Sequence, residues 1–326
     1  MSARGLPVLV APDSFKGTLS ARRVAAAVSS GLRDGGRDSI ELPVADGGEG
    51  TMEALLLAHG GELRRAVVSD PLGRPVEAEY ALLDSGESAV VEMARASGLG
   101  LVAEDERDAF AASTRGTGEL IAAAAGAGAR SVLVAVGGSA TTDGGAGAVS
   151  ALTEARVRSE LVVACDVRTA WENAPRVFGP QKGADAGTVG RLERRMARLA
   201  RAAPRDPRGV PMTGAAGGLA GGLWAHLGAR LVPGAGYVLD SVGFDPAMRS
   251  ARFVVTGEGR LDEQTLAGKV VGEVATRCRQ AGVACHAVVG EEALDGFLER
   301  LIDLSTVTEA GTVRRLRAAE RRLAEI

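Results

Sequence analysis

Lysine occurs at only three positions in this chain of 326 residues, Lys16, Lys182 and Lys269, and each of them lies next to a glycine. The chain carries 38 lysines and arginines in total, so arginine supplies nearly every other positive charge. A lysine ammonium is a compact point charge on a flexible stem, which suits contact with a phosphate or a carboxylate. We therefore expect at least one of these lysines to bind an anionic ligand beside a glycine-rich turn.

Carboxylates form the second group of candidate residues, because they follow three short apolar runs that are typical of buried strands. Asp13 follows the run at 7–11, Asp46 and Glu49 follow the run at 40–45, and Glu258 and Asp262 follow the run at 253–255. The carboxyl ends of parallel strands meet at one edge of a sheet, and ligands of doubly wound domains bind there. We therefore expect these carboxylates to converge on one edge.

The segment Gly137-Gly-Ser-Ala-Thr-Thr-Asp-Gly-Gly145 predicts an anion site, because it lies between a buried apolar run and a helix. Unpaired backbone N–H groups and the helix dipole both favour negative charge at such a position. The alternative is a tight turn that needs glycine for positive φ. A second glycine-rich run at 214–222 is also a candidate, and close packing of helices explains it equally well.

Phosphoryl transfer is the chemistry that this inventory suits best. The reaction needs positioning, Mg²⁺ held by carboxylates and positive charge near the phosphoryl group, but little covalent catalysis. The three histidines are scattered and the three cysteines form no Cys-x-x-Cys pair, which argues against a zinc site. The P-loop, the dinucleotide fingerprint and the protein-kinase motifs are absent from the sequence.

The composition limits the classes of partner. A net charge of −3 and an aromatic content of 3% argue against a nucleic-acid partner. Charges interrupt every apolar run, so we expect no membrane span. The sequence shows no signal peptide, and we expect a cytoplasmic protein.

The pattern of apolar runs predicts an α/β fold with two domains. Residues 1–66 and 250–326 carry continuous apolar strands separated by helices, which predicts a flavodoxin-like, doubly wound parallel sheet built from both chain ends. Residues 67–249 are predicted to form an inserted, mixed α/β domain, because the run at 76–83 alternates as an antiparallel strand does. The active cleft is expected between these two domains.

Eight segments of the sequence resemble the bacterial glycerate kinase family, of the glycerate 2-kinase type. They are Ala11-Pro-Asp-Ser-Phe-Lys-Gly-Thr-Leu-Ser-Ala21, Val44-Ala-Asp-Gly-Gly-Glu-Gly-Thr51, Ser113-Thr-Arg-Gly-Thr-Gly-Glu119, Gly137-Gly-Ser-Ala-Thr-Thr-Asp-Gly-Gly-Ala146, Ala164-Cys-Asp-Val167, Phe178-Gly-Pro-Gln-Lys-Gly183, Gly214-Ala-Ala-Gly-Gly218 and Thr256-Gly-Glu-Gly-Arg260. The resemblance follows the family's order from about residue 8 to residue 275 and includes all three lysines.

The resemblance implies ATP-dependent phosphorylation of D-glycerate with Mg²⁺, and 2-phosphoglycerate as the product. Lys16 and Arg260 would hold the carboxylate of glycerate, and Asp46 or Asp13 would accept the proton of its hydroxyl group. Candidate ligands of Mg²⁺ or its water shell are Asp143, Asp166, Glu258 and Asp262. Candidate contacts of the ATP phosphates are Gly137, Gly138, Ser139, Thr141, Thr142, Gly144, Lys182, Gly217 and Gly218.

The chain departs from the family pattern at three places. Only about ten residues join the helix near Ala151 to the strand at Leu161, where the family carries a longer segment with glycine. Residues 168–173 replace an Asn-Pro-rich stretch, and Val271 replaces a proline. Two alternatives therefore stay open, a non-catalytic regulator that binds glycerate or nucleotide and a kinase for another small hydroxy acid. We expect a monomer or a homodimer.

Overall fold

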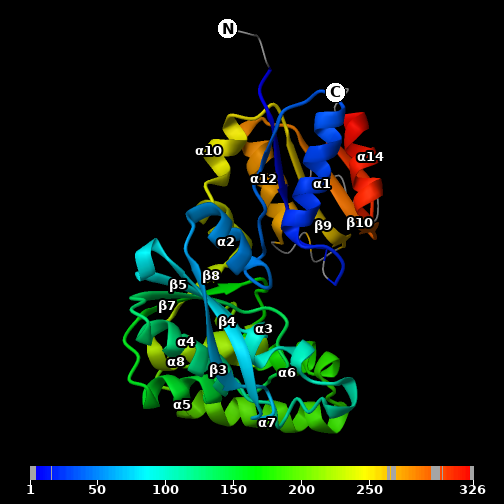
Figure 1. The fold of residues 1–326 in the computed structure, drawn as a ribbon. Helices are drawn as coiled ribbons and strands as arrows, with labels where there is room; N and C mark the ends of the chain where they lie inside the picture. Colours follow the sequence, from blue (N-terminus) through cyan, green and yellow to red (C-terminus); the bar gives the residue numbers. More distant parts are fainter. Residues whose placement is uncertain are drawn as a thin grey trace. The chain divides into compact units, whose positions relative to one another are not determined.

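The computed structural model describes residues 5–15, 17–262, 265, 269–294, 302 and 304–323. The chain forms two compact units (Figure 1). Unit 1 comprises Met1–Asp46, Glu53–Ala58 and Ala235–Ile326, and unit 2 comprises Gly47–Met52 and His59–Gly234. Both chain ends therefore belong to unit 1.

Unit 1 is built on a parallel sheet. Its strands are β1 (Val8–Pro12), β2 (Ser39–Glu41), β9 (Val254–Leu261), β10 (Cys285–Glu292) and β11 (Thr306–Glu309). Within the described residues these five strands lie in the order β11-β10-β9-β1-β2, and every neighbouring pair is parallel. Counted along unit 1 this is the order 2-1-3-4-5 of flavodoxin-like sheets, so the predicted fold class is confirmed.

Helices cover both faces of this sheet. In β1, Val8 and Val10 belong to one buried cluster and Leu9 and Ala11 to another. Helices α1 (Ala21–Asp34) and α14 (Val313–Leu323) pack on the first face, and Figure 1 shows them side by side. Helices α9 (Gly234–Ser241), α10 (Phe244–Arg249) and α12 (Val270–Ala281) pack on the second face. Because both faces are buried, the strands read as continuous apolar runs in the sequence.

Unit 2 contains a mixed sheet. Its strands are β3 (Glu62–Ser69), β4 (Pro75–Leu83), β5 (Ser88–Glu92), β6 (Ser131–Ala135), β7 (Glu160–Cys165) and β8 (Arg230–Pro233), in that spatial order. The pairs β3–β4 and β4–β5 are antiparallel, as the alternation at 76–83 predicted, and the remaining pairs are parallel. The sequence did not predict β3 or β8, because β3 is a largely exposed edge strand and β8 has only four residues.

Helices and short turns complete unit 2. The longer helices are α4 (Arg115–Gly126), α5 (Ala146–Glu154), α7 (Ala186–Ala202) and α8 (Leu219–Leu227), and the short ones are α3 (Ala94–Ser97) and α6 (Ala174–Phe178). Helices α4, α5 and α8 contribute to the same core as the strands, which includes Leu120, Leu152 and Leu223. Helix α2 (Thr51–His59) lies where the chain passes between the units. No helix among the described residues combines the length and the apolar character that crossing a membrane requires.

Candidate active site

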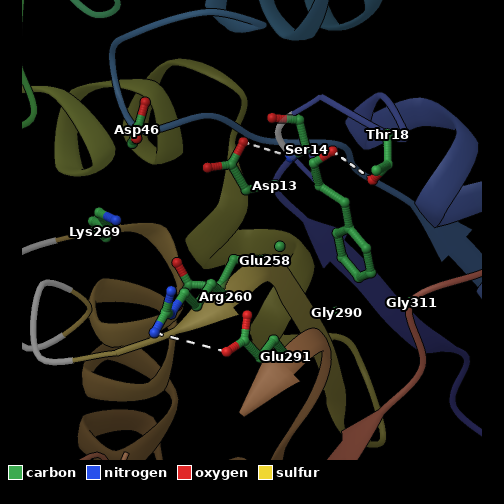
Figure 2. A pocket seen from close by; sticks show the side chains of 12 residues that line it. Asp13, Ser14, Thr18, Asp46, Glu258, Arg260, Lys269, Gly290, Glu291 and Gly311 are labelled. Carbon is green, nitrogen blue, oxygen red and sulfur yellow. Dashed lines mark hydrogen bonds and ion pairs between the residues drawn. The ribbon is translucent and has the colours of Figure 1, made fainter. Parts of the chain in front are cut away.

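A cavity of about 380 Å³ lies in unit 1 at the carboxyl ends of β1, β9, β10 and β11 (Figure 2). Its lining residues are Asp13, Ser14, Phe15, Thr18, Asp46, Glu258, Gly259, Arg260, Lys269, Gly290, Glu291 and Gly311. The chain order of the sheet reverses between β1 and β9, and ligands of doubly wound sheets bind at such a switch point. The location therefore marks this cavity as the candidate active site of unit 1.

Three buried carboxylates meet at this cavity. Asp13, Asp46 and Glu258 are 5%, 1% and 6% exposed. The position of Asp13 is fixed at the end of β1, because its backbone N–H donates to the carbonyl of Gly257 and its Oδ1 accepts from the backbone N–H of Ser14 at 2.6 Å. The structure thus brings together one carboxylate from each of the three predicted strand ends. Asp262 does not line the cavity, and Glu49 belongs to unit 2.

Glu258 is the carboxylate whose proton affinity the fold changes most clearly. Burial raises the pKa of Glu258 to about 7, and the neighbouring carboxylates of Asp262 and Asp46 act in the same direction. A hydrogen bond of 2.6 Å from the hydroxyl of Thr265 and the charge of Lys269 oppose this rise. Glu258 therefore changes its charge near neutral pH, as groups at functional sites often do.

Two cations also line the cavity. The Arg260 guanidinium is 59% exposed and lies 3.7 Å from Oε1 of Glu291, toward which it is turned in Figure 2. Lys269 immediately precedes α12 and acts electrostatically on Glu258. The sequence indicated Lys269 only as one of three lysines beside glycine and gave it no role of its own, whereas the structure places it in the lining of the cavity. Lys16 lies outside the described residues.

Glycines bring the strand ends close together beside the cavity. A Cβ atom added to Gly290 would lie only 2.5 Å from the carbonyl oxygen of Gly259 on the neighbouring strand. Any side chain at position 290 would therefore collide with backbone. Because β9 and β10 lie so close together here, only the residues next to these glycines, such as Arg260 and Glu291, contribute side chains to the cavity wall.

In unit 2, the glycine-rich loop at 137–145 encloses a buried lysine. Lys182 is 1% exposed, and its Nζ donates to Oγ of Ser139 at 2.8 Å and to the carbonyl of Thr141 at 2.6 Å. Burial lowers the pKa of Lys182 to about 7, and the charge of Asp143 opposes this change. The ammonium therefore holds the loop in shape from inside the protein.

The buried ammonium of Lys182 predicts a specific pH dependence of stability. Its folded-state pKa is lowered from 10.5 to about 7, so between these values the unfolded chain binds a proton that the folded chain does not. The free energy of unfolding should rise as pH increases through this window, by at least about 1 kcal/mol. Urea titrations from about pH 7 to pH 10 should show this rise for the wild type and not for Lys182→Met. The same slope in both proteins would contradict the assignment.

The two glycine-rich segments of unit 2 pack directly against each other. Gly217 has φ of +63°, and a Cβ added there would lie 2.0 Å from the carbonyl oxygen of Thr141. The backbone N–H of Gly144 donates to the carbonyl of Gly217, and Gly218 packs against Gly144. Within the described residues, the hydroxyl groups of Thr141 and Thr142 are buried and have no hydrogen-bond partner. Close packing explains Gly217 and Gly218, whereas the fold leaves the two buried hydroxyl groups unsatisfied among the described residues.

The predicted metal ligands are divided between the two units. In unit 2, Asp143 accepts hydrogen bonds from the backbone N–H groups of Thr114, Gly145 and Gly147 and from the hydroxyl of Thr114. Asp166 follows β7, and burial, together with the charge of Asp166, raises the pKa of the Cys165 thiol. In unit 1, Glu258 and Asp262 are electrostatic neighbours. In the part of the chain that the structure describes, no three His, Cys, Asp or Glu residues form a group that could hold a metal.

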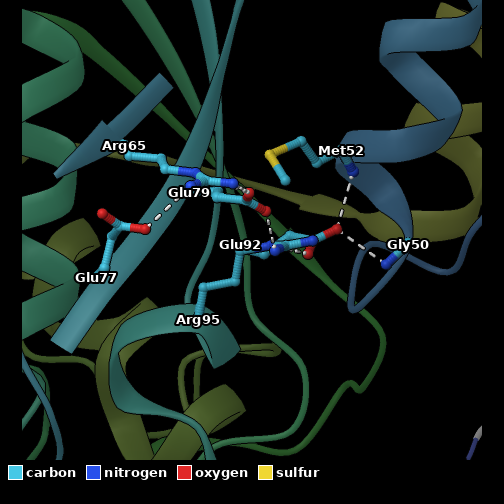
Figure 3. A network of polar contacts seen from close by, with 7 residues as sticks. All are labelled: Gly50, Met52, Arg65, Glu77, Glu79, Glu92 and Arg95. Carbon is cyan, nitrogen blue, oxygen red and sulfur yellow. Dashed lines mark hydrogen bonds and ion pairs between the residues drawn. The ribbon is translucent and has the colours of Figure 1, made fainter. Parts of the chain in front are cut away.

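A buried carboxylate that the sequence did not indicate fixes the loop after Asp46 (Figure 3). Glu92, at the end of β5, is 2% exposed, and its Oε1 accepts from the backbone N–H groups of Gly50 and Met52 at 2.9 and 3.0 Å. Its Oε2 accepts from Nε of Arg95 at 3.0 Å, and Arg95 continues the network to Glu79. A carboxylate at the start of α2 satisfies backbone donors that the helix leaves unpaired.

Glu92→Gln tests this network. Gln keeps the shape but loses the charge that two backbone N–H groups and Arg95 share, so unit 2 should lose roughly 1–3 kcal/mol of unfolding free energy. Glu77→Gln is the matched control, because Glu77 is 60% exposed at the solvent end of the same network. Its cost should stay below about 1 kcal/mol. Urea unfolding of both variants measures the difference, and equal costs would show that Glu92 has no special role.

Three comparisons with known proteins extend these observations. A family model described as "Glycerate kinase family" matches residues 8–157 and 152–310. A protein named "Glycerate kinase" from Bacillus subtilis (strain 168) is 40% identical in an alignment of 332 positions, which covers 89% of this chain and 86% of the relative. "Glycerate 2-kinase" from Escherichia coli (strain K12) is 36% identical, and the alignment covers 94% of this chain and 93% of the relative.

A solved structure agrees with both sequence comparisons. The crystal structure of a candidate glycerate kinase 2 from Salmonella typhimurium LT2 superposes with a TM-score of 0.83 and 34% sequence identity. The similarity covers 98% of each chain.

Proposed function

Because this chain belongs to the glycerate kinase family, we propose that it transfers the γ-phosphoryl group of ATP to D-glycerate and gives 2-phosphoglycerate and ADP. The observation that carries the proposal is the cavity of unit 1, which two cations and three buried carboxylates line at the switch point of a parallel sheet. This set of groups matches an anionic substrate whose hydroxyl group must lose a proton.

The cations of the cavity are proposed to hold the carboxylate of glycerate. Arg260 offers a planar fork of donors, which matches the two oxygens of a carboxylate. Lys269 adds a second positive charge to the same lining. Lys16 keeps the substrate-binding role that the motif resemblance gave it. The volume of about 380 Å³ leaves room for a three-carbon acid.

Asp46 is proposed to accept the proton of the attacking hydroxyl group. In the transfer, the hydroxyl oxygen forms a bond to the γ-phosphorus while the bond to the bridging β–γ oxygen breaks. The proton passes to the carboxylate of Asp46, and ADP leaves with the electron pair of the broken bond. We favour Asp46 over Asp13, because Asp46 is the more deeply shielded from water, at 1% against 5% exposed.

Glu258 and Asp13 are proposed to hold Mg²⁺. Four carboxylates and two cations line the cavity, so a divalent cation would reduce the excess of negative charge. Mg²⁺ in proteins is usually coordinated by one or two carboxylates together with phosphates and water. The two carboxylates of Glu258 and Asp13 match this ligand set. When bound, the ion supplies positive charge that neutralises the charge of the phosphate groups.

The loop at 137–145 is proposed to bind the phosphates of ATP. The buried hydroxyl groups of Thr141 and Thr142, which lack partners among the described residues, support this assignment. Lys182 is proposed to shape the loop, since its ammonium is already bonded to Ser139 and Thr141.

The proposal is tested by mixing the purified protein with Mg-ATP and D-glycerate and following the release of ADP. ³¹P NMR then identifies the phosphoglycerate isomer. Turnover with 2-phosphoglycerate supports the proposal, and the 3-phospho isomer would overturn the choice of hydroxyl group. If D-glycerate raises the melting temperature without any ADP release, the chain is a non-catalytic binder. Faster turnover with another small hydroxy acid would replace the proposed substrate.

A further inference from the structure

A second cavity lies in unit 2, where α4 and α5 end and where β6 and β7 begin. Its volume is about 550 Å³, and its lining combines small or apolar residues with one serine and three arginines. The lining residues are Ala122, Ala125, Gly126, Gly128, Ala129, Arg130, Ala155, Arg156, Val157, Arg158 and Ser159. We call this cavity the Arg156 groove. Helix α4 and the segment that follows α5 contribute to this lining, and the two helices pack against each other (Figure 1).

The Arg156 groove carries positive charge that the protein does not use internally. Among the described residues, the side chains of Arg156 and Arg158 form no hydrogen bond and no ion pair, whereas Arg130 pairs with the exposed Glu87 at 2.6 Å. The nearby carboxylate of Glu154 is already bound by Arg115 at 2.8 Å. Two guanidinium groups at the groove are therefore available to an anion from solution.

The backbone of Arg156 is a second and independent indication. Helix α5 ends with the backbone N–H groups of Arg156 and Val157 donating to the carbonyls of Thr153 and Leu152, a Schellman motif. The residue that follows the C-cap in this motif adopts the left-handed backbone conformation, and Arg156 occupies this position with φ of +52°. The neighbouring helix α4 ends in the same motif with glycine, Gly128, at this position. Glycine would fill the position of Arg156 without strain, whereas arginine places a charged side chain at the groove at a cost in backbone strain.

The link that carries Arg156 is also where this chain departs from its family. The family model matches in two segments, 8–157 and 152–310, which overlap at residues 152–157. The match is therefore interrupted at the end of α5 and at the start of the link to β7. The Arg156 groove and the cavity assigned to glycerate share no lining residue, so they are separate sites.

We propose that the Arg156 groove binds a small organic phosphate. Guanidinium groups match phosphate oxygens as planar, charged donors. Two uncommitted positive charges balance the charge of a phosphate monoester, which is roughly −1.5 to −2 at neutral pH. The alanine and glycine floor accommodates the carbon part of the ligand. The proposal does not depend on the kinase activity, because none of its residues belongs to the proposed active site.

The experiment titrates the full-length protein with phenyl phosphate and, separately, with inorganic phosphate. Amide NMR signals of Gly126, Gly128 and Ser159 report on the groove, and binding elsewhere moves other signals. Arg156→Gly is the central variant, because it removes the guanidinium and relieves the strained backbone. The melting temperature of this variant without ligand should be no lower than that of the wild type and up to about 2 °C higher. A loss of binding would therefore not reflect misfolding. Arg158→Ala removes the second cation, and Arg198→Ala is the matched control, an exposed arginine of α7 without an ion pair among the described residues.

Phenyl phosphate should move the three groove signals in the wild type and in Arg198→Ala. The affinity should fall roughly tenfold or more in Arg156→Gly and in Arg158→Ala, and added salt should weaken binding in the wild type. Inorganic phosphate should bind more weakly than phenyl phosphate, because it has no apolar group to bury against the alanine and glycine residues of the groove. The proposal would be overturned by unmoved groove signals at about 20 mM phenyl phosphate, or by equal affinity in the wild type and both variants.

Discussion

Replacing Asp46 by Asn should lower kcat for the phosphorylation of D-glycerate by roughly 10²–10⁴-fold, with a KM for glycerate that changes far less. Asn has the shape of Asp but cannot accept the proton of the attacking hydroxyl group. Asp46 is 1% exposed, so water does not readily replace its carboxylate. Steady-state kinetics with saturating Mg-ATP measure both constants.

Two controls sharpen the interpretation of Asp46→Asn. Asp240→Asn changes an aspartate of unit 1 that is 70% exposed and lies outside the cavity lining, and its kcat should equal that of the wild type. A titration with Mg²⁺ separates proton transfer from metal binding. Recovery of Asp46→Asn activity at high Mg²⁺ would contradict the assigned role and would make Asp46 a metal ligand instead.

Replacing Glu258 by Gln should stabilise unit 1 above neutral pH and at the same time lower activity. The folded-state pKa of Glu258 is raised from 4.5 to about 7, so between these values the folded chain keeps a proton that the unfolded chain has lost. The stability of the wild type therefore falls as pH rises through this window. Gln carries no such cost, and the variant should gain roughly 2–4 kcal/mol at about pH 8 and almost nothing at about pH 4.

The activity of Glu258→Gln should fall at least tenfold, since the variant removes one of the two proposed Mg²⁺ ligands. Greater stability with less activity is the usual consequence of removing a buried charge that serves function. Urea unfolding at both pH values, together with the ADP-release assay, measures these effects. Glu291→Gln is the control, because Glu291 lines the same cavity but is 60% exposed. A variant of Glu258 that is less stable than the wild type at about pH 8 would refute the raised pKa.

The fold was largely predictable because its signals are local. Continuous apolar runs at 7–11 and 285–289 became β1 and β10, since strands buried on both faces need no polar residues. Ser20 is a residue type that favours the N-cap position of a helix, and its side chain accepts from the backbone N–H of Arg23 at the start of α1. The comparisons confirm the family that the motifs indicated, and the chain is an enzyme of that family.

The site was less predictable because its groups depend on distant partners. Thr114 binds the carboxylate of Asp143 across 29 positions of sequence, and no local pattern reveals that this aspartate caps the start of α5. Lys182 was one of the three candidate lysines, but only the structure shows that its ammonium is buried within the loop. Glu92 was missed, because a single glutamate at the end of an apolar run looks like an exposed residue.

A crystal structure of the protein with D-glycerate tests the central claim most directly, namely that the cavity of unit 1 holds the substrate. The account predicts glycerate in this cavity, with its carboxylate within hydrogen-bond distance of Arg260 or Lys269 and a hydroxyl group beside Asp46. Glycerate bound elsewhere, with no ligand among the carboxyl ends of β1 and β9, would contradict it.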